Sequence, residues 1–332
     1  MTLSQPAWTQ GTFNYYAAPS SMPMEEQVLI SPFDYPSNLQ KNLASQALKS
    51  HELVVQNGRL DRDLYFVDPL PTAEAMRVLD SRGFFCLKWP SATTDFWDAS
   101  LLMQCYFPEI KSLALSLTGA DRLAVASHTH RMQGDATHLT PANRGLVARG
   151  AAFTVHNDFS NKLTNQFVEM HENNMQSIIT DRINEGGLGL DNIDDLKNGR
   201  LCIINFWRSI GPEPANRNPL AILDAATMGS QDIVQCRHVA KRDNASFLKH
   251  YRLPVPFINT LTRRNPSHQW YYFPEMDSSE VLVFKNYDSL SPQPSNGVGM
   301  HSSFDDPQTP VAAPSRESLE VRIMCFWFDR DG

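Results

Sequence analysis

The second half of the chain alternates short apolar runs with turns rich in Pro, Gly, Asn and Asp, and this pattern constrains the fold most. We expect strands at Ala151–His156, Leu201–Trp207, Leu220–Ala225, Trp270–Phe273, Val281–Phe284, Met300–Phe304 and Leu319–Phe328. Upstream, Gly83–Lys88 and Leu123–Arg131 predict two further strands, and Thr72–Leu79 and Thr94–Leu117 predict helical segments. Many short strands favour a sandwich or barrel over a doubly wound sheet.

The 332 residues divide by composition into two parts. Residues 1–70 are rich in Pro, Ser, Asn and Tyr and read as an N-terminal arm. Residues 71–332 read as one β-rich domain, because barrels of this size commonly form a single domain. Apolar residues at helical spacing predict a helical insertion at about 161–200.

Charge and cysteine usage exclude several classes of protein. The net charge of -7 argues against binding to nucleic acid, since no basic surplus is present to neutralise phosphates. No apolar stretch approaches the length that spans a membrane. The five cysteines are scattered, without a Cys-x-x-Cys pair, and the first sixteen residues lack a secretory signal pattern. We therefore expect a cytoplasmic protein with free thiols.

One apolar run ends in His156-Asn157-Asp158. Side chains two apart on a strand point to the same side, so His156 and Asp158 can grip one ion, while a third ligand must come from a neighbouring strand. His301 lies on a later expected strand. Two imidazoles and one carboxylate, without a thiolate, suit a ferrous ion that keeps one face open. A lone His-x-Asp is common by chance, so the surrounding sequence decides its meaning.

The last expected strand adds a polar face to this picture. Alternation puts Arg316, Ser318, Glu320 and Arg322 on one side of it. An arginine beside the distal histidine offers a planar fork to a carboxylate beyond the metal. This layout would hold the far end of 2-oxoglutarate while its keto acid end chelates iron.

A series of short motifs then extends over most of the chain after about Arg59. They are Leu79-Asp80-x-x-Gly83-Phe84, Gly119-Ala120, His130-Arg131, Val155-His156-x-Asp158, Asn205-x-Trp207-Arg208, Pro219-Leu220-Ala221, Lys285-x-Tyr287-Asp288-Ser289, His301 and Arg316-x-Ser318-x-Glu320-x-Arg322. In number and order they resemble the Fe(II)/2-oxoglutarate oxygenases of microbial secondary metabolism. That group includes fungal gibberellin desaturase-like proteins and the cephamycin 7α-hydroxylase component.

The resemblance implies a double-stranded β-helix, a jelly-roll barrel of the cupin type with flanking helices. It also implies iron bound by His156, Asp158 and His301, with 2-oxoglutarate gripped by Arg316 and helped by Ser318. The long segment 161–200 departs from the family pattern, which puts any carried-over substrate identity in doubt.

Two arginines compete for the role of cosubstrate anchor, because Arg316 and Arg322 share a face. The Arg-x-Ser pattern favours Arg316, whereas Arg322 needs a partner in either case, since an unpaired buried guanidinium is very costly. Asn205 is a hypothetical donor to the metal-bound carboxylate of the cosubstrate. Arg208 has two equal interpretations: an ion pair with Asp224 or Glu320, or a clamp for a carboxylate of substrate or 2-oxoglutarate.

Aromatic and histidine residues complete the pocket candidates. Trp207, Tyr271 and Tyr272 read as core, with an aromatic pocket lining as the alternative. His130 forms a His-x-His pair with His128 and reads as a packed strand end, with a pocket role as the alternative.

The resulting hypothesis is an Fe(II)/2-oxoglutarate-dependent oxygenase that uses O2, with ascorbate considered as a reductant. It would hydroxylate, desaturate or oxidatively cyclise a small natural-product or amino-acid-like substrate in secondary metabolism. No nucleic-acid or membrane partner is expected, and the oligomeric state is left open. The alternatives are a metal-dependent dioxygenase that needs no 2-oxoglutarate and a non-catalytic cupin-like protein that binds a small molecule.

Overall fold

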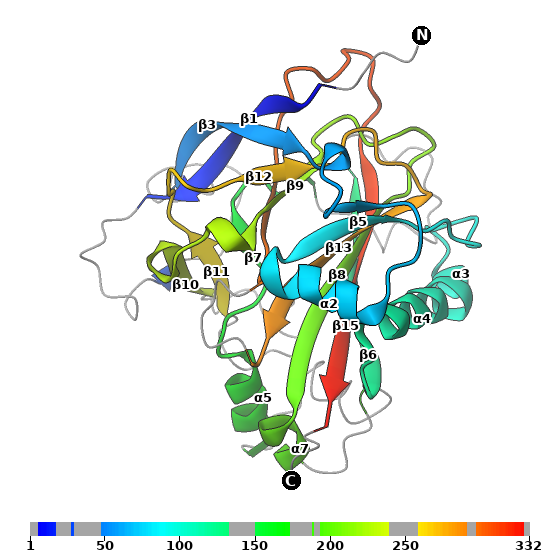
Figure 1. The fold of residues 1–332 in the computed structure, drawn as a ribbon, viewed down its shortest axis with the longest axis vertical. Helices are drawn as coiled ribbons and strands as arrows, with labels where there is room; N and C mark the ends of the chain where they lie inside the picture. Colours follow the sequence, from blue (N-terminus) through cyan, green and yellow to red (C-terminus); the bar gives the residue numbers. More distant parts are fainter. Residues whose placement is uncertain are drawn as a thin grey trace, which may run out of the picture.

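Two β-sheets form the body of the protein in the computed structural model, which describes residues 6–17, 28–29, 48–132, 150–172, 188, 193–238, 258–290 and 297–328 (Figure 1). The nine-stranded sheet has the order β1 (Trp8–Tyr16), β3 (Leu48–Asn57), β12 (Trp270–Tyr272), β9 (Leu220–Leu223), β14 (Met300–Ser303), β7 (His156–Asn157), β11 (Ile258–Thr262), β10 (Ile233–His238) and β2 (Val28–Leu29). The six-stranded sheet has the order β4 (Tyr65–Phe66), β5 (Phe84–Lys88), β13 (Glu280–Asp288), β8 (Arg200–Ser209), β15 (Glu317–Trp327) and β6 (Arg122–Met132).

The chain passes repeatedly from one sheet to the other. β7, β9 and β14 belong to the nine-stranded sheet, whereas β8, β13 and β15, which alternate with them along the sequence, belong to the six-stranded sheet. This alternation is typical of a jelly roll, in which the two sheets face each other across one core. The predicted double-stranded β-helix is confirmed.

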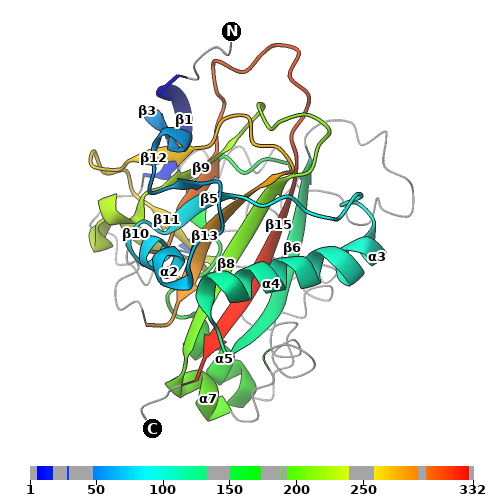
Figure 2. The same cartoon turned by 45° about the vertical axis from the view of Figure 1, so that its right-hand side comes forward.

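Helices cover the outer face of the six-stranded sheet. α2 (Thr72–Ser81) and α4 (Phe107–Thr118) pack on each other, and α4 follows α3 (Ala99–Leu101) and a π-helical segment, Leu102–Tyr106. Figure 2 shows α4 lying across β15 and β6. The predicted helix at Thr94–Leu117 begins later than expected, at Ala99. In the described part of the chain, short 3-10 turns occur at Gly58–Leu60, Ala225–Thr227 and Ser230–Asp232.

The apolar spacing of α4 explains its orientation. Ile110, Leu113, Ala114 and Leu117 recur at intervals of three and four and are buried. The helix ends at Gly119, which adopts the left-handed conformation (φ 61°) and donates its N–H to the Leu115 carbonyl. The chain then turns directly into β6.

The segment expected to be an N-terminal arm contributes strands to a sheet. β1 and β3 pair antiparallel, and β3 joins β12 in parallel register. The Phe13 ring stacks on Trp270 with centroids 4.4 Å apart, and the Trp270 indole N–H donates to the Tyr15 hydroxyl at 2.7 Å. These strands therefore share a core with the barrel.

The described part of the predicted helical insertion contains two helices that pack against the six-stranded sheet. α5 (Leu163–Glu172) packs on α7 (Ile193–Asn198) at the lower end of Figure 1. Phe167 and Leu196 are buried in a cluster with Met324 of β15. Residues 173–187, which carry the rest of the predicted helical pattern, lie outside the described residues. No helix in the described part of the chain is long and apolar enough to cross a membrane.

Candidate metal centre

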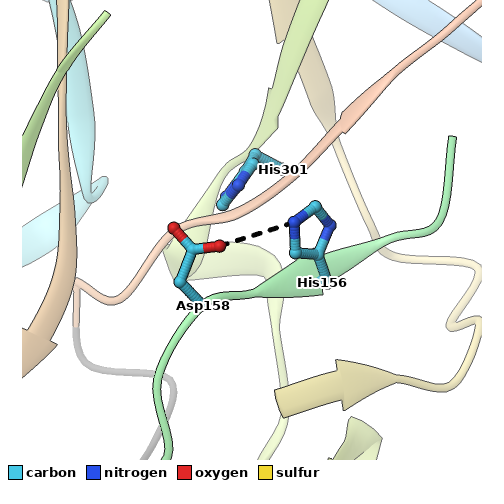
Figure 3. A group of neighbouring side chains, drawn as sticks. All are labelled: His156, Asp158 and His301. Carbon is cyan, nitrogen blue, oxygen red and sulfur yellow. Dashed lines mark ion pairs between the residues drawn. The ribbon is translucent and has the colours of Figure 1, made fainter. Parts of the chain in front are cut away.

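Three side chains from adjacent backbone segments converge between the two sheets. His156 begins β7, Asp158 follows this strand, and His301 lies on β14 directly opposite His156. The two imidazole centroids are 4.4 Å apart. The candidate ligand atoms of the three residues all lie within 4.8 Å of one another, and Figure 3 shows the side chains pointing toward a common space. The structure thus brings together the three residues that the sequence placed on one ion.

The protonation of the histidines suits metal binding. His156 Nδ1 lies 2.7 Å from the Thr154 carbonyl oxygen, so the proton belongs on Nδ1 and the Nε2 lone pair faces Asp158, 3.6 Å from Oδ1. Burial lowers the pKa of His156 and brings the pKa of His301 well below its ordinary value. Both rings are therefore neutral, as metal ligands must be.

Asp158 is held as an ionised carboxylate. Burial is the largest influence and raises its pKa, but the charge and hydrogen bonds of Arg322, together with His301 and His156, hold this pKa well below its usual range. Oδ2 accepts hydrogen bonds from Arg322 Nε and Nη2 at 2.9 and 2.7 Å and from Asn286 Nδ2 at 2.9 Å. Oδ1 faces His156 instead. One carboxylate oxygen is thus occupied by the protein, and the other is presented to the common space.

This donor set fits a ferrous ion. Two neutral imidazole nitrogens and one anionic oxygen, with no cysteine in the cluster, form the set that non-haem iron oxygenases use on one face of the metal. His156, Asp158 and His301 are the residues that would hold the ion.

A pocket extends from the two histidines to Arg316. Its lining residues are Arg131, Ala152, His156, Trp207, Leu220, His301, Ser303, Arg316 and Glu320. One end is therefore formed by candidate metal ligands and the other by a guanidinium. This is the arrangement that a carboxylic acid with a second chelating end requires.

Arg316 is buried, and the hydrogen bonds of its guanidinium go to neutral groups. Its Nη1 donates to the Asn218 carbonyl and to Ser303 Oγ at 3.0 Å, and its guanidinium lies 5.7 Å from the Trp207 ring centroid. Among the described residues it forms no ion pair with a carboxylate. Burial, with Arg131 nearby, lowers the pKa of Arg316 to about 9. A buried cation without an anionic partner is a built site for an anion.

The other predicted cosubstrate residues are placed differently. Arg322 pairs with Asp158 and with Glu320. Asn205 Nδ2 donates to Glu320 Oε1 at 2.7 Å and lies 3.5 Å from Asp158 Oδ2. Ser318 Oγ is buried and has no hydrogen-bond partner in the described part of the structure. Arg322 is thus committed to Asp158 and Glu320, Asn205 mainly to Glu320, and Ser318 has its hydroxyl available.

Arg208 differs from both interpretations made from the sequence. It points to the helix-covered face of β8, where Nε donates to the Tyr106 hydroxyl at 3.1 Å and Nη1 to the Ser278 carbonyl. Neither expected carboxylate pairs with it, because Asp224 is paired with Arg82 and Glu320 with Arg322. The alternation of β8 turns Arg208 away from the pocket that Trp207 lines.

His130 and the tyrosines also lie outside the lining of this pocket. His130 Nε2 donates to the Phe96 carbonyl at 2.8 Å, and its ring stacks on Trp97. Tyr271 lies against Phe84 and Arg82, and Tyr272 packs on Phe304. Of the three predicted aromatic pocket residues, only Trp207 lines the pocket.

Sequence reasoning missed several residues around the site. Arg131 shares the inward face of β6, opposite Ser318 of β15, and strand alternation could have found it. Asn286 was not predictable, because the register of β13 shifts between Lys285 and Tyr287 and breaks the simple alternation. A second pocket is lined in part by Asn286 but by none of the three candidate ligands.

Comparisons with known proteins relate this chain to several oxygenases and oxidoreductases by sequence and by fold. The alpha-ketoglutarate-dependent dioxygenase phiK of Fungal sp. (strain ATCC 74256) is 26% identical over 280 residues, covering 83% of this chain and 88% of that protein. The hydroxylase/desaturase asaB of Aspergillus flavus is 31% identical over 136 residues, covering 40% of this chain and 57% of asaB. The solved structure of the iron and alpha-ketoglutarate-dependent endoperoxidase NvfI has a TM-score of 0.67 at 22% identity, covering 97% of this chain and 99% of that one.

The structural likeness shows the fold, and the names of the relatives confirm the resemblance inferred from the motifs. A family model described as an oxidoreductase/YMDC permease-like domain matches residues 13–326. Because this match spans nearly the whole chain, the protein belongs to the oxidoreductase/YMDC permease-like family.

Proposed function

We propose that this protein is an Fe(II)/2-oxoglutarate-dependent oxygenase acting on a small organic substrate of secondary metabolism. The observation that carries the proposal is the pocket between the His156–Asp158–His301 cluster and Arg316. When bound, the iron and 2-oxoglutarate supply the oxidising chemistry: O2 and 2-oxoglutarate are consumed, succinate and CO2 are formed, and the substrate is oxidised. The names of the relatives, a dioxygenase and a hydroxylase/desaturase, support the same reaction class.

The chain itself supplies position and charge. His156 and His301 hold the cation as neutral ligands, and Asp158 contributes one anionic oxygen. Arg316 binds the distal carboxylate of 2-oxoglutarate, and that carboxylate supplies the charge partner that the buried guanidinium lacks. Ser318, with its hydroxyl available, is a second donor near the same end of β15.

The substrate enters beside the metal, against the aromatic and apolar lining that Trp207 and Leu220 provide. Hydroxylation, desaturation and oxidative cyclisation all follow from the same set of bound groups, and the placement of the substrate decides among them. The scattered thiols, of which Cys86, Cys202 and Cys325 are buried and free, support a cytoplasmic location.

The test is cosubstrate turnover by the reconstituted protein. Apo-protein is supplied with Fe(II), 2-oxoglutarate, O2 and ascorbate, and succinate is measured together with the mass change of candidate small acids and amino acids. We expect succinate from wild type and none above background from Asp158→Ala.

The same experiment separates the alternatives. Substrate oxidation that needs iron and O2 but proceeds without 2-oxoglutarate would indicate a dioxygenase of another kind. Binding of small molecules with neither iron uptake nor succinate would indicate a non-catalytic cupin-like protein.

A further inference from the structure

The oxygen of Asp158 that faces away from His156 is saturated by the protein. Oδ2 receives both Nε and Nη2 of Arg322 and the amide of Asn286, so little capacity is left for another partner. The carboxylate can therefore offer only Oδ1 to a cation. A metal ligand that is fixed through its second oxygen has its orientation set before the metal arrives.

Arg322 is in turn held directly by residues of β6 and of its own strand, β15, and indirectly by a residue of β8. Its Nη1 donates to Thr129 Oγ1 of β6 at 3.0 Å, and its Nη2 pairs with Glu320 Oε1 on its own strand. Asn205 of β8 donates to the same Glu320 oxygen at 2.7 Å. Arg322 is 8% exposed, Glu320 3% and Asn205 0%, so water does not weaken these contacts.

The charges in this network have a consequence for a bound cation. Asp158 and Glu320 are anionic and Arg322 is cationic, which leaves the three together with a single negative charge. Without Glu320, the positive Arg322 would cancel Asp158 directly behind the metal position. Glu320 is placed as the ion-pair partner of Arg322, with Oε1 against Nη2, and Asn205 donates to the same oxygen.

We propose that Arg322 and Glu320 form a positioning pair for the metal. Arg322 occupies Oδ2 of Asp158 so that Oδ1 alone is presented, and Glu320 neutralises Arg322 so that the charge of Asp158 remains available to the cation. This inference rests on the proposed function, because it assumes that the cluster binds a metal.

Metal binding without turnover tests the pair. Co(II) is titrated into the apo-protein and its visible absorption is recorded, which reports both affinity and ligand number. Glu320→Gln keeps the shape but removes the compensating charge, and we expect it to weaken Co(II) binding by about 10- to 100-fold. The matched control is Glu317→Gln on the opposite face of β15, where the carboxylate accepts from Trp97 Nε1 at 2.9 Å, and it should bind Co(II) like wild type.

A charge-matched double variant, Arg322→Met with Glu320→Met, keeps the test decisive if Glu320→Gln does not fold. Replacing a buried ion pair by apolar residues is often tolerated, and it restores one negative charge. If Glu320→Gln folds, we expect the double variant to bind Co(II) more tightly than Glu320→Gln does. In every case we expect the visible spectrum of its bound Co(II) to differ from that of wild type, because Oδ2 of Asp158 is released.

The outcomes separate the two claims. If wild type bound no Co(II), the proposed function itself would fail. If wild type bound Co(II) but Glu320→Gln matched Glu317→Gln, or the double variant kept the wild-type spectrum, the positioning pair alone would be wrong.

Discussion

At the scale of single residues, Arg316 and Arg322 share a strand face and a charge, but their different surroundings give them different roles. Arg322 contacts the carboxylates of Asp158 and Glu320, whereas the hydrogen bonds of Arg316 go to the Asn218 carbonyl and the Ser303 hydroxyl. A guanidinium that is already paired with two carboxylates has few N–H donors left for a ligand. A guanidinium without a carboxylate partner gains most from binding an anion.

This division predicts that the same substitution affects the binding of a different ligand at each of the two positions. Arg316→Met should weaken 2-oxoglutarate binding by about 2 kcal/mol or more while Co(II) still binds, because a desolvated charge partner is lost. Arg322→Met should mainly change the affinity for Co(II), because Arg322 holds Asp158 in place. Calorimetric titration of each variant with Co(II), and then with 2-oxoglutarate, measures both effects. Unchanged 2-oxoglutarate affinity in Arg316→Met would remove it as the anchor.

The sequence predicted the residues whose placement depends on strand periodicity. His156, Asp158 and the inward face of β15 follow from side chains that alternate along a strand. The partner of Arg208 did not follow, because Asp224 and Glu320 were each nearest to another arginine in space. Asn286 did not follow either, since a bulge redirects it. Pairing and bulges depend on contacts far apart in sequence, which periodicity does not encode.

At the scale of elements, a glycine governs how the strand of His301 enters the sheet. Gly297 precedes β14 and adopts φ 71°, a left-handed conformation. A Cβ there would overlap the Leu79 carbonyl oxygen at the end of α2. Gly299 follows and donates its N–H to the Lys285 carbonyl of β13. The start of β14 is therefore fixed by the close contact of α2, the loop at Gly297 and β13.

Gly297→Ala should therefore destabilise the protein and loosen the candidate metal site together. We expect a loss of about 2 kcal/mol or more in the free energy of unfolding, from backbone strain and the overlap with backbone. Gly150→Ala is the matched control, because a Cβ there meets nothing within 4 Å. Urea unfolding followed by fluorescence measures the difference, and equal stability of the two variants would contradict this view of the loop.

Some elements escaped sequence analysis for a physical reason. The inward positions of β1 are Thr9, Gly11, Phe13 and Tyr15, of which only two are large and apolar, so its alternation is weak. β10 and β11 were missed as well, and they pair with each other across residues 239–257, which lie outside the described part. The strands β8, β13 and β15 were found because their apolar content is nearly continuous.

At the scale of the whole molecule, the N-terminal strands and the barrel share one core. Phe13 and Tyr15 are fully buried against Trp270, and the Phe13 ring also stacks on Phe304, which follows β14. The first strand in sequence thus packs against the residue that follows β14, the strand that carries His301, and Figure 1 shows β1 and β3 beside β12 and β9 of the same sheet. The boundary at residue 70 separates compositions, whereas the packing continues across it.

This continuity predicts a large effect from one N-terminal residue. Phe13→Ala should lower the free energy of unfolding by about 3–5 kcal/mol, because it leaves a cavity in a packed aromatic stack. Trp8→Ala removes a larger side chain from the same strand, but Trp8 is 50% exposed, and its effect should stay within about 0.5 kcal/mol. Thermal unfolding compares the pair. Similar losses in both variants would mean that β1 is not part of the core.

The central claim is that His156, Asp158 and His301 bind Fe(II) and that Arg316 holds 2-oxoglutarate on it. An Fe(II) ion chelated by a 2-oxo acid has a visible charge-transfer absorption band, so anaerobic titration of apo-protein with Fe(II) and 2-oxoglutarate tests both parts at once. We predict the band in wild type, its absence in His301→Ala, and its appearance in Arg316→Met only at much higher 2-oxoglutarate concentration. No band in wild type, or an equal band in His301→Ala, would contradict the account.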